Sequence, residues 1–336
     1  MTPFDYAHPE TEAEAVDFLS EFPADTALLA GGTDLVSLMQ REVLQPRRVV
    51  DLKNVASLRG IREADGGLLI GVLTTLEEMN DSPLLREHRS LLHVIDGIRA
   101  IQVQSNGTLG GDLCHLPNCW YFRSGYGLLA TEDGKSLPEI GDNRYHAVFG
   151  NGGPAKFVSA SRFAPPAIAW NAKVRLAGPS VRSDRLQPGH GREEWLPLEG
   201  FFRTPKTEKQ GVTFLKPGQF VTHVWLPRAN GQVSASYEVL QSEGLDWPLA
   251  AAAATLRLQF GVVAEARIVL GHVAPTPRVA HRAAAFLIGK SLNESTAAEA
   301  ADLATADATP LSMNEYKVQL ARTAVKRALL RAADNG

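Results

Sequence analysis

The amino-acid sequence predicts an α+β fold with two domains. Its 336 residues suffice for two domains of about 150 residues each, and its apolar content of 44% is ordinary for a globular protein. Short apolar runs that end in glycine turns alternate with helix starts in the first half, and three apolar runs precede three helical segments in the last third. The expected first domain covers 1–178, and a C-terminal α+β domain covers 192–336 after a linker at 179–191. Within the first domain, we expect subdomains at about 1–58 and 59–178, the second with an irregular insertion at about 117–166.

Charge and hydropathy exclude two classes of partner. The net charge is −3 and the basic residues are dispersed, so we expect no nucleic acid. No uninterrupted apolar stretch reaches about 18 residues, so we expect no membrane insertion. The first residues show neither a basic nor an apolar segment, so we expect no export signal, and the two cysteines, Cys114 and Cys119, fit a reducing compartment. We expect a cytoplasmic protein, or a periplasmic one only if it is exported folded with a signal-bearing partner.

The first subdomain has a β–α–β pattern. A capping box at Thr11 predicts a helix that ends near residue 20, and apolar runs predict strands at 26–30 and 48–52. Between these strands, Asp34 is expected to cap a short helix that follows the glycine turn at 31–32. The N–H groups of this turn then lie at a helix start, which is an arrangement that binds anions.

The second subdomain begins with a hairpin that leads into a strand at 68–72. A capping box then starts at Thr75. The hydroxyl groups of Thr74 and Thr75 lie at this strand-to-helix turn, where they either contribute to a phosphate site or only cap the helix. A longer helix is expected at about 84–98.

From Pro117 to Pro166 the chain is rich in Gly, Pro and Asn, so we expect an irregular insertion over the first domain. Residues 150–155 match the Gly-x-Gly-x-x-Gly/Ala dinucleotide pattern. No helix start follows them, so we interpret the match as accidental. Two short strands within 167–176 are expected to close the domain before a linker rich in Gly, Pro, Ser and Arg.

The C-terminal domain is expected to contain an antiparallel sheet followed by helices. A capping box at Ser312 is expected to open the last helix. The expected strands are at about 234–240, 249–258 and 263–271, and the expected helices at about 278–288, 295–304 and 313–333.

Two glycine-rich turns are the strongest functional signal. The first covers 30–34 directly after an apolar run, and the second covers 107–112, with three glycines in five positions. Glycines remove the Cβ atoms that keep a bulky anion away from backbone N–H groups. We therefore expect both turns to hold one extended ligand that contains a diphosphate.

Taken together, the two turns resemble the FAD loops of the FAD-binding subunit in the xanthine dehydrogenase and carbon monoxide dehydrogenase family of molybdenum hydroxylases. The resemblance covers nearly the whole chain. It implies a two-subdomain FAD domain of the vanillyl-alcohol-oxidase type, followed by a C-terminal domain of three-stranded antiparallel sheet plus helices. It also implies FAD binding by Ala30, Gly31, Gly32, Thr33, Asp34 and Leu35 in the first loop and by Gly107, Thr108, Gly110, Gly111, Asp112 and Leu113 in the second.

Residues outside the two glycine loops can also be compared with the family. Gln102 matches a glutamine of the family, but Gln104 stands where relatives commonly place an arginine that contacts the phosphate or the flavin. Asp246 and Trp247 resemble a loop close to the flavin, although Trp247 alternatively packs only at the domain seam. The pair Phe201 and Phe202 either lines the flavin pocket or belongs to the core.

Residues 114–123 are similar to the branch related to periplasmic aldehyde oxidoreductases. Some flavin subunits of that branch hold a four-iron cluster with four cysteines. This chain has two, so an all-cysteine cluster within it cannot form. We interpret Cys114 and Cys119 as a remnant of such a site, a buried thiol pair or a disulfide, and we expect no metal on this chain.

The resemblance implies an electron-transfer subunit that carries FAD. Its partners would be a large subunit with the molybdenum cofactor, which oxidises an aldehyde, a purine or another heteroaromatic compound, and a small subunit with two two-iron clusters. Electrons would leave the FAD to a small-molecule acceptor, and no residue of this chain is expected to be catalytic.

Two alternatives remain from the sequence. The first is a stand-alone FAD-dependent oxidase or dehydrogenase of the same fold, and the second is a structural subunit without flavin. For the favoured function, the second loop predicts that Gly110→Val yields a soluble protein that lacks flavin, since a branched side chain would stand where the backbone meets phosphate.

Overall fold

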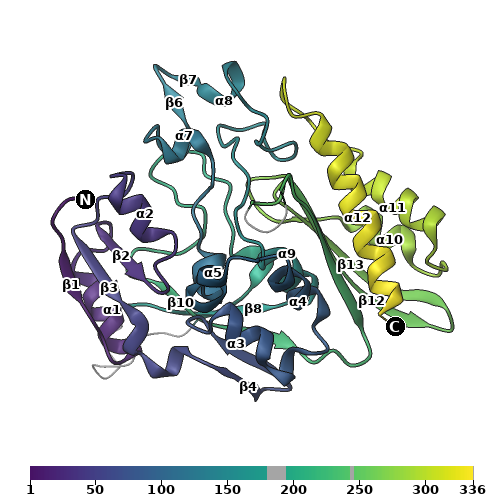
Figure 1. The fold of residues 1–336 in the computed structure, drawn as a ribbon, viewed down its shortest axis with the longest axis horizontal. Helices are drawn as coiled ribbons and strands as arrows, with labels where there is room; N and C mark the ends of the chain where they lie inside the picture. Colours follow the sequence, from purple (N-terminus) through teal and green to yellow (C-terminus); the bar gives the residue numbers. More distant parts are fainter. Residues whose placement is uncertain (180–193, 243–245, 336) are drawn as a thin grey trace, which may run out of the picture.

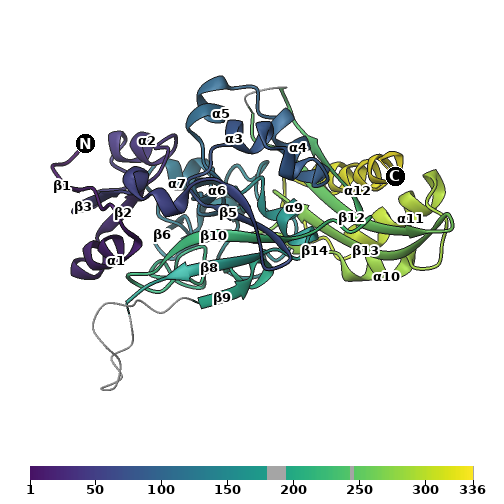
Figure 2. The same ribbon diagram turned by 90° about the horizontal axis from the view of Figure 1, so that it is seen from below.

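The computed structural model describes residues 1–179, 194–242 and 246–335. Figure 2 shows a small sheet at the N-terminal end, a five-stranded sheet in the middle, and a third sheet with its helices at the C-terminal end. The predicted α+β class is confirmed. Within the described residues, no helix has the length and apolar character needed to cross a membrane.

The N-terminal sheet is parallel, with the order β1-β3-β2. Thr11 caps α1 as predicted, because its Oγ1 accepts from the Glu14 N–H at 3.2 Å, but the Glu14 carboxylate accepts from the N–H of Glu10 and not of Thr11. The elements are β1 (Asp5–Ala7), α1 (Glu12–Glu21), β2 (Thr26–Leu29), α2 (Leu35–Gln40), β3 (Arg48–Asp51) and two 3-10 turns, η1 (Leu52–Asn54) and η2 (Ala56–Leu58).

The central sheet is antiparallel, with the order β4-β5-β10-β8-β9. Three of its strands precede the predicted linker and two follow it. The strands are β4 (Ile61–Ala64), β5 (Gly67–Gly71), β8 (Lys173–Ala177), β9 (Glu194–Pro197) and β10 (Phe220–Pro227). The helices beside it are α3 (Leu76–Asp81), η3 (Pro83–Leu85), α4 (Arg89–Asp96), α5 (Ile101–Asn106), α6 (Leu109–Leu113), α9 (Ala164–Ala169) and η4 (Leu198–Gly200).

The central sheet corrects the predicted domain division. Strand β10 lies between β5 and β8, so residues 194–227 complete the sheet of the first domain and do not belong to the C-terminal domain. One hydrophobic core is built mainly from residues up to Ala229, and a second mainly from residues after it. We therefore propose a boundary near residue 230. The predicted linker, 179–191, lies almost entirely outside the described residues.

Two predicted elements of the first domain differ in the structure. The single helix expected at 84–98 is a 3-10 turn followed by α4, because His88 leaves the helical conformation and its Nε2 lies 2.9 Å from the Pro227 oxygen. The two strands expected within 167–176 are the end of α9 and the single strand β8. Prolines are well tolerated in the first turn of a helix, and periodicity alone does not separate a short buried helix from a strand.

The insertion has only short elements and stands above the central sheet in Figure 1. It also reaches the C-terminal domain, because the N–H groups of Val148 and Phe149 both donate to the Val273 oxygen. The stretch at 150–155 starts no helix. The elements are α7 (Trp120–Arg123), β6 (Thr131–Glu132), β7 (Lys135–Ser136) and α8 (Leu137–Ile140).

The C-terminal domain packs helices against one antiparallel sheet with the order β11-β12-β13-β14. Three strands are long, as predicted, and the fourth has two residues. Buried alanines on β12, α11 and α12 let these elements approach closely. The elements are β11 (Val233–Val239), β12 (Ala250–Gln259), β13 (Val262–Gly271), β14 (Arg278–Val279), α10 (His281–Leu287), α11 (Glu294–Thr305) and α12 (Tyr316–Asp334).

The capping box predicted at Ser312 does not form. Helix α12 begins at Tyr316 without a side-chain cap. The Ser312 hydroxyl instead accepts from the Asn143 amide at 2.9 Å, and the Asn314 amide donates to the His146 oxygen at 3.1 Å. These side chains join α12 to the insertion, a long-range use that the local pattern does not reveal.

Candidate functional site

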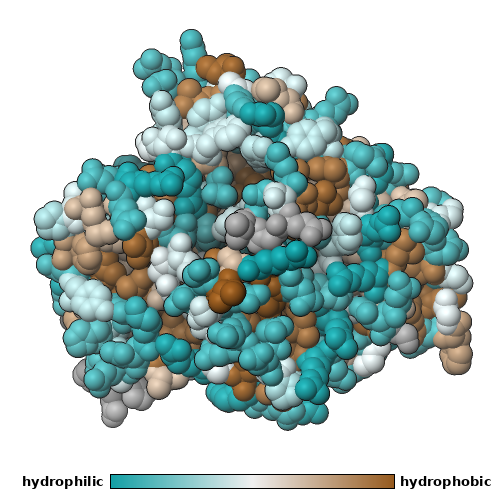
Figure 3. All heavy atoms as spheres, viewed as in Figure 1, coloured by the Kyte–Doolittle hydropathy of each residue, from teal (hydrophilic) through white to brown (hydrophobic). Residues whose placement is uncertain are grey.

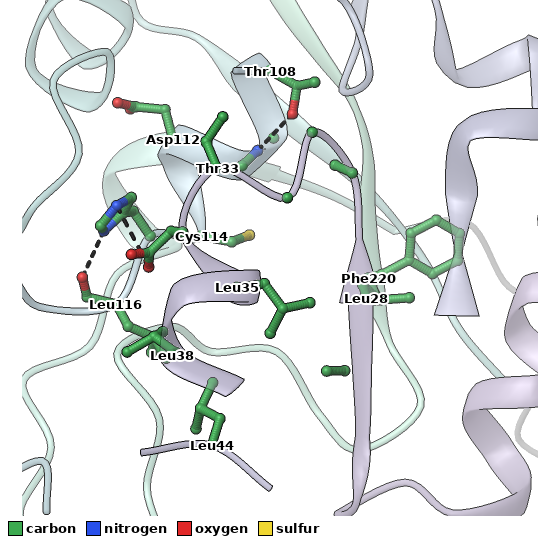
Figure 4. A pocket seen from close by; sticks show the side chains of 18 of the residues that line it. Leu28, Thr33, Leu35, Leu38, Leu44, Thr108, Asp112, Cys114, Leu116 and Phe220 are labelled. Atoms are coloured by element: carbon green, nitrogen blue, oxygen red, sulfur yellow. Dashed lines mark hydrogen bonds and ion pairs between the residues drawn. The ribbon is translucent and has the colours of Figure 1, made fainter. Parts of the chain in front are cut away.

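A cavity of about 1310 Å³ lies where the N-terminal subdomain, the second glycine loop, the insertion and the C-terminal domain meet. Small-molecule pockets usually measure about 300–1,000 Å³, so this cavity accommodates a large ligand. All six residues of the predicted first loop line it, and so do Gly107, Thr108, Gly110, Gly111 and Asp112 of the second. The two loops therefore converge on one space, as the sequence predicts, and Figure 4 shows part of this space.

The loops touch each other at Gly31. A Cβ atom on Gly31 would lie 1.6 Å from the Asn106 oxygen and 3.4 Å from the Gly107 nitrogen. No side chain fits in that distance, because real Cβ contacts stay beyond about 3 Å. Gly31 is therefore required for the direct backbone contact between the first loop and the second.

The first loop offers unused donors to the cavity. The N–H groups of Gly31, Gly32, Thr33 and Asp34 donate no hydrogen bond to any part of the chain that the structure describes. Gly32 has a φ of +72°, which turns the backbone into the start of α2. Consecutive free N–H groups in such a turn form a concave anion site. The first loop can therefore bind an anion, and its role in FAD binding stays a prediction.

The second loop differs from its prediction. The N–H groups of Leu109, Gly110 and Gly111 donate to the Thr74 oxygen, the Val72 oxygen and the Thr108 hydroxyl (Figure 4 shows the last bond). Within 107–112, only the Thr108 N–H has no acceptor among the residues described here. The second loop therefore contributes one free N–H group, and its glycines serve mainly the packing of α6.

Asp34 does not cap α2. It occupies the N-cap position without a side-chain cap bond. Its carboxylate instead forms an ion pair with Arg123, whose Nη2 lies 3.2 Å from Oδ2, and the His115 Nε2 lies 3.5 Å from the same oxygen. Arg123 also donates to the backbone oxygens of Pro117 and Leu116. Asp34 thus fixes the start of the insertion against the first loop.

Asp112 joins the second loop to the end of the insertion. Its carboxylate accepts from the Ser161 hydroxyl at 2.5 Å and from the N–H groups of Arg162 and Phe163 at 3.1 and 3.0 Å. Burial raises the pKa of Asp112, while these hydrogen bonds act in the opposite direction. The carboxylate is therefore already satisfied by protein groups.

Several predicted site residues do not line the cavity. Leu113 is buried in the core, and Gln102 and Asp246 are exposed and do not belong to the lining, although neighbours of both in the chain do. The Thr74 hydroxyl donates to the Gly60 oxygen at 3.1 Å, and Thr75 forms the capping box of α3 with Glu78. Thr75 thus has the capping role that the sequence left open, whereas Thr74 neither caps the helix nor lines the cavity.

Thr75→Ala should therefore reduce stability without affecting FAD. Loss of a threonine cap costs about 0.5–2 kcal/mol of unfolding free energy. We expect a lower urea midpoint and unchanged flavin content per folded chain. If the variant instead lost bound flavin and kept its full stability, Thr75 would belong to the phosphate site.

Trp247 lines the cavity. Its indole N–H donates to the Ala160 oxygen at 2.9 Å, and its ring centroid lies 5.0 Å from that of His115. Trp247 therefore both packs at the boundary between the two domains and lines the cavity. In contrast, Phe201 and Phe202 are buried in the first core. Gln104 donates to the Ile98 oxygen at 2.5 Å and is not among the lining residues.

Both cysteines are free, so the disulfide reading is wrong. Cys114 lines the cavity, and burial raises its pKa to about 12. The Cys119 sulfur lies 3.2 Å from the His146 Nε2. The sequence pattern at 114–123 did not reveal that His115 and Arg123 hold the first loop, although a histidine and an arginine in an aromatic stretch were a usable signal.

The chain matches two protein-family models. Residues 2–229 match the FAD binding domain in molybdopterin dehydrogenase, and residues 235–332 match the CO dehydrogenase flavoprotein C-terminal domain. These limits agree with a division near residue 230.

Known proteins resemble the chain over nearly its full length. The carbon monoxide dehydrogenase medium chain of Hydrogenophaga pseudoflava is 28% identical, with 97% of this chain and 96% of the relative covered. The putative xanthine dehydrogenase FAD-binding subunit of Escherichia coli is 25% identical, with 97% and 95% covered.

Solved structures agree with this relation. Carbon monoxide dehydrogenase from Hydrogenophaga pseudoflava, in a form that lacks the Mo-pyranopterin moiety, superposes with a TM-score of 0.76 at 28% identity, covering 100% of this chain and 99% of the other. Quinoline 2-oxidoreductase from Pseudomonas putida 86 gives 0.74 at 26% identity, covering 99% and 98%. The chain therefore belongs to the family of FAD-binding subunits of molybdopterin dehydrogenases.

Proposed function

We propose that this chain is the FAD-carrying electron-transfer subunit of a molybdenum hydroxylase complex. Its partners would be a large subunit with the molybdenum cofactor and a small subunit with two-iron clusters, and its electrons would pass to a small-molecule acceptor. The observation that carries the proposal is the backbone contact between Gly31 and Asn106, which brings the free N–H groups of the first loop into one large cavity.

The residues present fit FAD. The N–H groups of Gly31 to Asp34 and of Thr108 would hold the diphosphate. An apolar part of the wall suits a flat aromatic group of the cofactor, and Figure 4 labels its side chains Leu28, Leu35, Leu38, Leu44 and Phe220. Bound FAD would supply the electron exchange, so the protein's task is to position the cofactor and exclude water.

The free thiols of Cys114 and Cys119 support a reducing compartment, and we propose a cytoplasmic complex. No acid or base on this chain is assigned to the organic substrate. Substrate oxidation would occur on the large subunit, and this chain would carry only the electrons.

Purification under native conditions tests the function. We expect the isolated full chain to bind stoichiometric FAD and to leave it oxidised when aldehydes or purines are added. In the complete complex, the substrate should reduce the same FAD. Reduction of FAD by substrate in the lone chain would identify a stand-alone oxidase or dehydrogenase, and absence of FAD from the native complex would identify a structural subunit.

A further inference from the structure

A buried ion pair forms part of the cavity wall at the domain seam. The side chains of Arg162, at the end of the insertion, and Glu238, on β11, are only 8% and 7% exposed. The Arg162 Nε donates to the Glu238 Oε1 at 2.9 Å, and Nη2 donates to the other carboxylate oxygen. The backbone N–H of Arg162 is held by Asp112. Two bonds to Glu238 therefore fix the guanidinium group, and Asp112 fixes the backbone that carries it.

One nitrogen of the Arg162 guanidinium group, which carries two N–H donors, is left over. Nη1 makes no hydrogen bond within the described parts of the chain, and Arg162 lines the cavity. Arg123 on the same wall differs, because its Nε, Nη1 and Nη2 all donate to Asp34 or to backbone oxygens. Arg162 is thus a buried cation with an unused donor nitrogen at the cavity.

The surroundings of Arg162 suit a flat polar ring. Trp247 and His115 line the same cavity with rings tilted by 50° to each other, and the Trp247 indole N–H donates to the oxygen of Ala160, two residues before Arg162. The N–H groups proposed for the diphosphate are others, those of the first loop and of Thr108. A heteroaromatic ring with carbonyl oxygens on its edge uses both features, the aromatic wall and the charged donor nitrogen.

The geometry points to Arg162 as the side chain that contacts the polar edge of the flavin ring and raises its reduction potential, with Glu238 as a positioning residue. This inference rests on the proposed function. Reduction adds electron density to the ring, and a fixed, buried cation beside it favours the electron-rich form. The Glu238 charge opposes this effect while holding the guanidinium in place.

The tightness of the site supports the positioning role of Glu238. A Cβ atom on Gly97, at the end of α4, would lie 2.8 Å from the Glu238 Oε2 and 2.9 Å from the Arg162 Nη2. The pair is therefore enclosed by the first domain, the insertion and the C-terminal domain. A small change in either partner moves the charge at the cavity wall.

The reduction potential of FAD in the full-length chain is the test, measured by equilibration with a redox dye of known potential. Glu238→Gln removes the opposing charge and should raise the potential. The double variant Arg162→Met with Glu238→Met leaves no unpaired buried charge and should lower it. We expect each change to alter the ratio of reduced to oxidised flavin at least tenfold, which is about 30 mV for a two-electron couple. Arg144→Met, which removes an exposed arginine paired with Asp142, should leave the potential unchanged.

The outcomes separate the alternatives. Shifts of opposite sign in the two variants support the inference. A loss of FAD affinity in the double variant at unchanged potential overturns it, because Arg162 would then bind phosphate or serve packing only. Unchanged potentials in both variants overturn it as well. If the unmodified chain binds no FAD, the proposed function fails instead.

Discussion

Gly31→Ala should abolish stable FAD binding. The added Cβ would lie 1.6 Å from the Asn106 oxygen, so the two loops must separate. Ordinary overpacking costs about 1–3 kcal/mol, and here the clash is with backbone that cannot rotate away. We expect at least a tenfold loss of FAD affinity and a reduced unfolding free energy. Bound flavin per chain, measured by visible absorbance after gel filtration, gives the first quantity, and urea unfolding gives the second.

Gly153→Ala is the matched control. It lies in the glycine-rich stretch at 150–155, and a Cβ there meets no atom within 4 Å. Flavin content and stability should both remain at the level of the unmodified chain. If Gly31→Ala also retains full flavin content, the contact between the loops is not needed for FAD, and the proposed phosphate site is wrong.

The structure changes the meaning of the earlier Gly110→Val prediction. A Cβ on Gly110 points to Val72, with the two Cβ atoms 2.6 Å apart, and not into the cavity. The valine would push α6 away from the end of β5. Loss of flavin in this variant would therefore not be separable from a packing defect, and Gly31 is the better test.

The convergence of the glycine loops could be predicted because each loop has a local glycine-rich signature, although only the first follows a strand and the second follows helix α5. The role of Asp34 could not, since its partner Arg123 lies 89 residues away. A polar residue before a helix predicts a side-chain cap. Here the carboxylate of that residue binds a charged partner elsewhere more strongly, so it does not accept from the N–H groups of the helix.

The domain division failed for a related reason. Strand β10 pairs with β5 and β8, and no local pattern states which distant strands become neighbours. The prediction placed the boundary in the most turn-rich stretch of sequence. Such composition marks a connection between elements, but it does not distinguish a loop within one sheet from a linker between domains.

A large loss of stability is expected when Lys317, in the first turn of α12, is replaced by methionine. Its side chain is 1% exposed, and Nζ donates to the oxygens of Tyr145, His146 and His272 at 3.1, 3.1 and 2.9 Å. Lys317→Met leaves the oxygens of Tyr145 and His272 without this donor, whereas the His146 oxygen keeps its bond from the Asn314 amide. Each unsatisfied group costs about 1–3 kcal/mol, partly offset by removal of a buried charge, so we expect a net loss of about 2 kcal/mol at pH 7.

The contribution of Lys317 to the unfolding free energy should depend on pH. Burial lowers the pKa of Lys317 from 10.5 to about 7. Between these values the unfolded chain binds a proton that the folded chain has released, so this group makes the folded state more stable as pH rises. The gain is at most about tenfold in the folding equilibrium constant per pH unit. Below pH 7 both states are protonated, and this contribution stays constant.

Urea unfolding at pH 7, 8 and 9 measures this dependence. The stability difference between the unmodified chain and Lys317→Met should widen with pH, because methionine has no proton to release. Lys326→Met is the control, since Lys326 lies on the same helix in a half-exposed ion pair with Glu294 and should cost no more than about 1 kcal/mol. A difference that stays constant from pH 7 to 9 would show that Lys317 keeps its ordinary pKa. The three carbonyl bonds would then hold a fully charged ammonium group between the insertion and the C-terminal domain.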